Sequence, residues 1–150
     1  MSAFLENYGA GEERRERIIK RIALSVLLLA VMGGILYYNF RNYKEERQSR
    51  LFFERLQAQD YEGAYQTWGC TPDTPCRDYS FEKFMEDWGP QSPHADLTAL
   101  SVKTSRSCEN GIIQTATFAS GDSVMLWVER SDLSLGFAPW PVCNPRIPAP

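Results

Sequence analysis

The strongest hydrophobic pattern in the chain is an unbroken apolar run from Ile22 to Tyr38, which reads I-A-L-S-V-L-L-L-A-V-M-G-G-I-L-Y-Y and carries no charge. A helix rises about 1.5 Å per residue, so roughly 20 apolar residues cross the hydrocarbon core of a bilayer. The run reaches that length over 18–40 when Lys20 and Arg21 extend toward the headgroups. The pattern therefore predicts a transmembrane helix over 18–40.

Two other interpretations of the apolar run are a buried core helix and a cleaved signal peptide. Basic residues flank both ends of the run, which is unusual for a core helix. A signal peptide needs small residues at its cleavage site, whereas this run ends in Tyr-Tyr-Asn-Phe-Arg. We therefore expect an uncleaved signal anchor, preceded by a short charged arm over 1–17.

Three helices are predicted after the anchor. The stretch 41–59 contains no Gly or Pro and is rich in helix formers, so we expect a juxtamembrane helix that continues the anchor into the following domain. Asp60 is placed to cap a second, short helix, which Gly69 ends. Ser80 is placed to cap a third, whose apolar residues follow helical spacing and predict a core face: Phe81, Phe84, Met85 and Trp88.

The chain changes to strand patterns after the third helix. A Thr-, Ser- and Val-rich segment over 97–108 and further strand segments over 112–119 and 123–129 are separated by turns. The segment 123–129 is apolar on both faces, so we place it centrally in the sheet or covered on both sides. Alternating apolar residues over 133–137 indicate a fourth strand. A Pro-rich tail follows over 139–150. The order predicts an α+β fold, with three helices packed on a curved antiparallel sheet of three or four strands.

Length and charge set limits on the domain and its partners. The 150 residues leave room for one small domain beyond the anchor, which we place over 45–138. From residue 41 onward the chain has eleven basic and fifteen acidic residues. An acidic domain lacks the basic face that nucleic acid requires, so we expect no nucleic-acid partner.

All four cysteines, Cys70, Cys76, Cys108 and Cys143, lie on the C-terminal side of the anchor. An even number on one side of a membrane indicates disulfides in an oxidising compartment. We favour the pairs Cys70–Cys76 and Cys108–Cys143; a zinc site is the alternative, although no CxxC pair is present. With slightly more basic residues before the anchor than after it, we expect a cytoplasmic N-terminus and a domain in the periplasm or extracellular space.

Small residues within the anchor suggest a second role for it. Ala30 and Gly34 lie four positions apart, and Gly33 adjoins them. This small-xxx-small spacing allows two helices to approach closely. It makes Ala30, Gly33 and Gly34 candidates for a helix–helix contact, in a homodimer or with another membrane protein.

The segment Leu56–Trp68, which reads L-Q-A-Q-D-Y-E-G-A-Y-Q-T-W, resembles the first-helix turn of the NTF2-like (cystatin-like cone) superfamily. The third helix and the strands follow in the same order as in that superfamily. An anchor before such a domain is similar to its membrane-anchored members, among them Mce-associated proteins and a class of secretion subunits. The resemblance implies a cone with an interior, for which Tyr65, Trp68, Trp88 and Trp127 are candidate lining residues.

Few side chains are candidates for chemistry. His94 is the only histidine and precedes Asp96 by two residues, but no nucleophile accompanies them, so a solvated loop histidine is the preferred interpretation. Glu82, Glu86 and Asp87 are adjacent on one predicted helix, where a solvated face is more common than a cation site. We assign no catalytic, cofactor-binding or metal residue.

Three functional hypotheses follow from these patterns. The first, which we favour, is a non-catalytic, membrane-anchored binding or assembly module whose partner is another envelope or membrane protein. The second is an enzyme or small-ligand carrier that uses the interior of the cone. The third is a structural subunit that acts mainly through its transmembrane helix. An interior filled by Phe and Trp would favour the first over the second.

Overall fold

The computed structural model describes residues 10–143 and divides into two compact units, with the boundary between Arg41 and Asn42. Most of the predicted arm (1–9) and most of the predicted Pro-rich tail (144–150) lie outside the described residues.

The first unit is a single helix, α1, over Ala10–Phe40. Its apolar side chains are open to the surroundings: Ile22 is 58%, Leu29 63% and Ile35 57% exposed. By length and composition it is the one described helix able to cross a membrane, and none of its apolar window is buried within the structure. This supports the predicted span.

The second unit, which we call the head, begins with α2 over Tyr43–Gln57. A break at Arg41 and Asn42 separates α2 from α1, so the helix expected over 41–59 starts anew at Tyr43 and ends at Gln57. One side of α2 is buried, including Phe52, Phe53 and Leu56.

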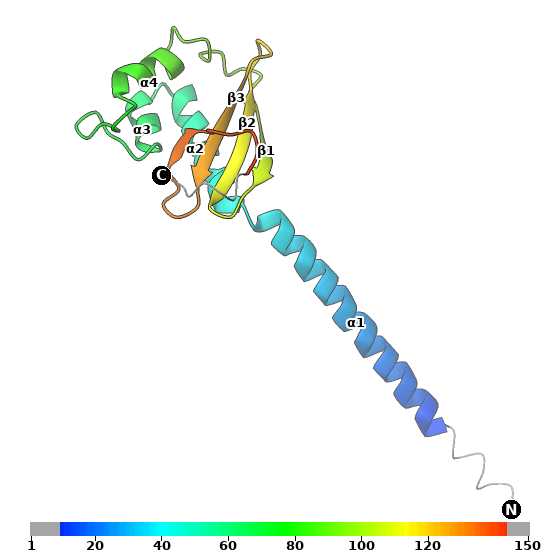
Figure 1. Cartoon of the computed structure of the whole chain (residues 1–150). Helices are drawn as coiled ribbons and strands as arrows, with labels where there is room; N and C mark the ends of the chain where they lie inside the picture. Colours follow the sequence, from blue (N-terminus) through cyan, green and yellow to red (C-terminus); the bar gives the residue numbers. More distant parts are fainter. Residues whose placement is uncertain (1–9, 144–150) are drawn as a thin grey trace, which may run out of the picture. The chain divides into compact units, whose positions relative to one another are not determined.

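Two shorter helices follow, α3 over Tyr61–Gln66 and α4 over Phe81–Trp88. The predicted caps are present: the Asp60 side chain accepts a hydrogen bond from the Gly63 amide, and the Ser80 side chain accepts one from the Lys83 amide. The helices lie together on one side of the sheet (Figure 1).

The sheet contains β1 (Ser101–Ser107), β2 (Gly111–Thr117), β3 (Ser123–Glu129) and β4 (Leu135–Phe137). The strands are antiparallel in the order β1-β2-β3-β4, so β1 and β4 form the two edges. The α+β fold with a four-stranded antiparallel sheet is thereby confirmed, and β3 occupies the interior position that its apolar sequence predicts.

Strand alternation separates an inner face, toward the helices, from an outer face. Ile112, Leu126 and Val128 are fully buried on the inner face and join the helical residues in one core. Neighbouring side chains in a strand point to opposite faces, so Ile113 and Trp127 belong to the outer face.

The chain after β4 crosses the sheet from one edge to the other (Figure 1). It first continues the β4 pairing, through the Ala138 amide and the Met125 carbonyl, and then reaches Cys108 at the end of β1 through Cys143. Helices cover the inner face, so this crossing runs over the outer face. Ile113, on that face, is only 2% exposed.

Candidate functional site

The interior between the helices and the sheet is filled by aromatic rings. We call the cluster of Phe52, Tyr65, Trp68, Phe84 and Trp88 the aromatic interior; all five are 7% exposed or less. The ring centroids of Phe52 and Trp88 are 5.0 Å apart, and those of Tyr65 and Phe84 are 5.2 Å apart. Three of the predicted lining residues, Tyr65, Trp68 and Trp88, are therefore packed against other rings as core.

A hydrogen-bond network holds the edge of this interior. The Tyr65 hydroxyl donates to the Tyr79 carbonyl and accepts from the Cys76 amide at 3.2 Å. The Tyr79 hydroxyl donates to Asp87 at 2.8 Å. Burial, together with the hydrogen bond to the Asp87 carboxylate, raises the pKa of Tyr79 well above its usual value. Tyr79 therefore remains a neutral donor throughout the physiological range.

Trp127, the fourth predicted lining residue, is on the other side of the sheet. Its indole Nε1 donates to the Glu129 carboxylate at 3.1 Å. Its ring lies over Gly111, where an added Cβ would come within 2.5 Å of the indole. The resemblance to a cone places Trp127 with the other three residues; strand alternation instead directs it to the outer face, and the structure separates it from them.

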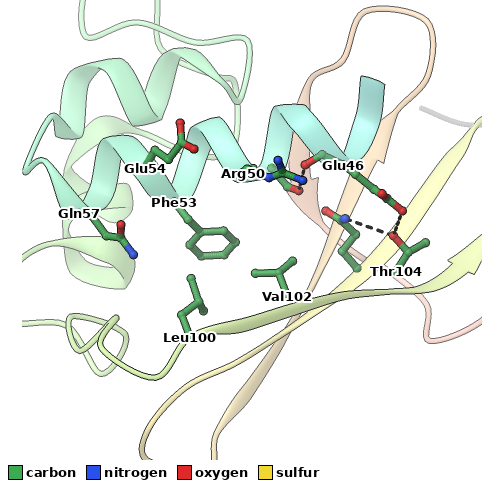
Figure 2. A pocket seen from close by; sticks show the side chains of 10 residues that line it. Glu46, Arg50, Phe53, Glu54, Gln57, Leu100, Val102 and Thr104 are labelled. Carbon is green, nitrogen blue, oxygen red and sulfur yellow. Dashed lines mark hydrogen bonds between the residues drawn. The ribbon is translucent and has the colours of Figure 1, made fainter. Parts of the chain in front are cut away.

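A cleft of about 400 Å³ lies between α2 and β1. We call it the α2–β1 cleft. Figure 2 shows the Phe53 side chain directed from α2 toward Leu100 and Val102, which provide the apolar floor. The remaining lining residues are polar or charged, and most come from α2: Glu46, Ser49, Arg50, Glu54, Gln57, Thr104 and Gln114.

A chain of hydrogen bonds fixes the polarity of the cleft. The Thr104 hydroxyl donates to the Glu46 carboxylate at 2.7 Å. The Thr104 oxygen then serves as an acceptor, and the Gln114 amide nitrogen donates to it at 3.3 Å (Figure 2). This arrangement leaves Oε1 as the free end of the Gln114 amide.

Gln114 Oε1 is buried and accepts no hydrogen bond from any residue that the structure describes, although the whole residue is only 3% exposed. A buried acceptor without a partner costs about 1–3 kcal/mol. Gln114 lines the cleft, so an unpaired acceptor lies beneath its surface next to the apolar floor. A ligand group with an apolar body and a donor at its tip would satisfy this acceptor once the side chains that cover it shift.

The charges of the cleft come from α2. Glu46, Arg50 and Glu54 are spaced four residues apart, which places them along one side of the helix. Within 10–143, no salt bridge joins Arg50 or Glu54 to another side chain. Two carboxylates and one guanidinium give the lining a net charge near −1 and leave it receptive to a basic group.

No local sequence pattern predicts this cleft. Its one available signal was Gln114, a polar residue at an inward position of the strand segment I-I-Q-T-A. Alternation assigns Ile112, Gln114 and Ala116 to the same buried face, where an amide is uncommon. Most other residues of the site come from α2, which is far from β1 in sequence, so no local pattern indicates that the two elements lie together.

An ion pair between a buried glutamate and an exposed arginine lies at the start of α2. Glu45, 3% exposed, accepts from the Arg130 guanidinium at 2.9 Å, and Arg130 also donates to the Asn42 side chain at 3.2 Å. Asn42 further accepts from the Ser107 hydroxyl at 3.0 Å. These bonds tie the first turn of α2 to the ends of β1 and β3, which fixes one end of the wall of the cleft.

The cysteines are paired as the sequence favoured. Cys70 is linked to Cys76 and Cys108 to Cys143, with Cα–Cα distances of 5.3 and 5.5 Å. These pairs leave no thiolate for zinc, and the part of the chain described by the structure contains no cluster of three or more metal-ligand side chains. The pairs are consistent with an oxidising compartment.

The remaining candidates for chemistry are separated from one another. His94 Nδ1 lies 2.9 Å from the Asp87 carbonyl, and its ring contacts Trp88 and Phe118. Asp96 instead accepts from the Thr98 hydroxyl and amide, which lowers the pKa of the Asp96 carboxyl. His94 is thus a packing residue near the end of α4, and its neighbour in sequence does not orient it.

No protein-family model matches the chain, and no curated protein or solved structure is significantly similar to it. The function is therefore inferred from the residues of the cleft.

Proposed function

We propose that the chain is a single-pass membrane protein whose head is a non-catalytic binding or assembly module outside the cytoplasm, and that the α2–β1 cleft is its binding surface. The observation that carries this proposal is the unpaired, buried Gln114 Oε1 beside an apolar floor. A site that uses so costly a group gains free energy when a partner supplies the missing donor.

Four further observations support the proposal. The aromatic interior is filled, which argues against a carrier or enzyme that uses the space between helices and sheet. The helix α1 is long and apolar enough to anchor the chain in a membrane. The two cysteine pairs suit a head exposed to an oxidising environment. A membrane protein partner, with no nucleic acid, fits the acidic head.

Photo-crosslinking in native membranes tests the proposal. A photoreactive residue replaces Gln57, an exposed lining residue of the cleft, and a matched control replaces Glu82, exposed on α4 away from the cleft. We expect a discrete crosslinked partner from position 57 and none from position 82. Equal crosslinking from both positions, or none from position 57, would contradict the cleft as the binding surface.

A further inference from the structure

The cleft lies along an unpaired edge of the sheet. In an antiparallel sheet, every second residue of an edge strand directs its N–H and C=O away from the neighbouring strand. β1 is such an edge, and β2 is its only neighbour in the sheet of the described residues. Its inward side chains Val102 and Thr104 line the cleft, so the free backbone groups and the cleft adjoin each other.

A β-bulge limits the usable part of this edge. The pairing of β1 with β2 shifts between Thr104 and Arg106. A bulge interrupts regular pairing and bends the strand away from a would-be neighbour. The regular part is therefore Ser101 to Thr104, which is also the part beside the cleft. A partner strand of a few residues fits this edge.

We infer that the head binds an extended segment of a partner protein, which adds as a strand along β1 and inserts one lysine or arginine side chain into the α2–β1 cleft. This inference rests on the proposed function, and it names the chemistry of the partner. Added strands obtain affinity from backbone hydrogen bonds and specificity from pockets for alternate side chains.

The lining of the cleft selects the inserted side chain. Phe53, Leu100 and Val102 form an apolar surface for the methylene stem of a lysine or arginine. The positively charged end is a donor, as the unpaired Gln114 Oε1 requires. The two carboxylates, of Glu46 and Glu54, attract the positive charge of the inserted side chain, and together they outweigh the one positive charge of Arg50. An acidic side chain would meet two carboxylates and a carbonyl oxygen.

A second copy of this chain is a less suitable strand. Pairing of two β1 edges would bring Lys103 and Arg106 of one copy close to the same residues of the other. Like charges opposite each other destabilise a sheet. The inward residues Val102 and Thr104 would also bring no basic group to the cleft. The edge therefore favours a different protein.

Defined peptides test this inference on the full chain in lipid nanodiscs. The probe is the acetylated, amidated peptide Thr-Val-Thr-Lys-Thr-Val-Thr, which presents valine and lysine on one side. Its matched control has norleucine in place of lysine, which keeps the stem and removes the donor. By isothermal titration calorimetry we expect the lysine peptide to bind about tenfold more tightly, because a hydrogen bond to a charged donor is worth that factor or more.

Two modifications separate strand addition from simple charge attraction. N-methylation of every second amide of the probe removes the donors of one strand edge only. We expect one alternate set of methyl groups to abolish binding and the other to leave it unchanged. Hydrogen exchange of the amides of residues 101–104 should slow with the unmodified lysine peptide. Equal binding of both methylated peptides would overturn strand addition.

Gln114→Met tests the acceptor, with Gln66→Met, at an exposed position of α3 outside the cleft, as its control. We expect Gln114→Met to remove the preference for lysine over norleucine, and Gln66→Met to retain it. A preference that survives Gln114→Met would overturn the role of the acceptor. Failure of all peptides to bind, with crosslinking from position 57 intact, would overturn this inference alone; loss of both would also remove the proposed function.

Discussion

The aromatic interior and the α2–β1 cleft lie on the same face of the sheet, and α2 separates them. Phe52 and Phe53 are neighbours in sequence, with ring centroids 4.9 Å apart, yet Phe52 belongs to the interior and Phe53 lines the cleft. On the interior side rings fill the space, whereas on the cleft side polar groups border an open volume. Apolar side chains suffice to close a core, and a hollow persists where polar residues replace them.

The two regions also differ in the kind of polar group that lacks a partner. In the interior the Tyr65 and Tyr79 hydroxyls find acceptors, while the indole N–H donors of Trp68 and Trp88 have no hydrogen-bond partner among the described residues. In the cleft Thr104 satisfies one end of the Gln114 amide and leaves an acceptor without a partner beside an open volume. We therefore expect the closed interior to contribute stability and the open cleft to contribute binding. Four predictions test this division, from the largest effect to the smallest.

Truncation of an interior ring should destabilise the head most. Phe84 is fully buried, with its ring centroid 5.2 Å from that of Tyr65 and 6.3 Å from that of Phe52. We expect Phe84→Ala to lower the free energy of unfolding by about 3–5 kcal/mol, because it leaves a cavity. Phe53 is also buried, at 4% exposed, but it borders the cleft, so Phe53→Ala should cost less because the space it leaves would open into the cleft. Urea unfolding followed by tryptophan fluorescence measures both; equal costs would contradict the comparison.

Loss of the ion pair between Arg130 and Glu45 should have the next largest effect. The Arg130 side chain is 39% exposed, so solvent screens the pair, but Arg130→Ala leaves the buried Glu45 carboxylate without its cation, and we expect a loss of about 1–3 kcal/mol. The control is Arg50→Ala, an exposed arginine of the cleft, for which we expect a change within about 0.5 kcal/mol. Both values come from the same urea experiment. A cost for Arg50→Ala as large as that for Arg130→Ala would give the cleft a structural role.

Removal of the unpaired acceptor should stabilise the head slightly. Gln114→Met has similar volume and eliminates the buried Oε1, so we expect a gain of up to about 1 kcal/mol. Thermal unfolding measured by circular dichroism records it as a higher Tm. A gain in stability together with weaker partner binding would mark Gln114 as a binding residue. A clear loss of stability would instead make it part of the core.

Alkaline pH should destabilise the head through Tyr79, at the edge of the interior. The pKa of Tyr79 is raised in the folded protein, so its stabilising effect is complete below the unfolded value of about 10 and is lost as the pH rises above it. Urea midpoints measured between neutral pH and about pH 11 should fall, and less steeply for Tyr79→Phe. If the urea midpoint of Tyr79→Phe falls with pH as steeply as that of the unmodified protein, groups other than Tyr79 cause the loss of stability at alkaline pH.

Much of the fold was predictable because local signals and the tertiary structure agree. The apolar run from Ile22 to Tyr38 predicts the long helix α1, whose length and composition are those of a membrane span. Asp60 and Ser80 cap helices where the sequence places caps, and apolar spacing identifies Phe84 and Trp88 as core. Each of these features depends on residues within a few positions of one another.

Local sequence patterns were enough to predict the long apolar helix, the order of helices and strands, and the division into an apolar segment and an acidic, cysteine-bearing head. Packing between distant segments determines that rings fill the interior, that Trp127 lies on the outer face, and that Gln114 meets Thr104 and Glu46 in a cleft. Periodicity reports which face of its own element a side chain occupies. Which elements come to face each other depends on packing between residues distant in sequence, and the site lies between such elements.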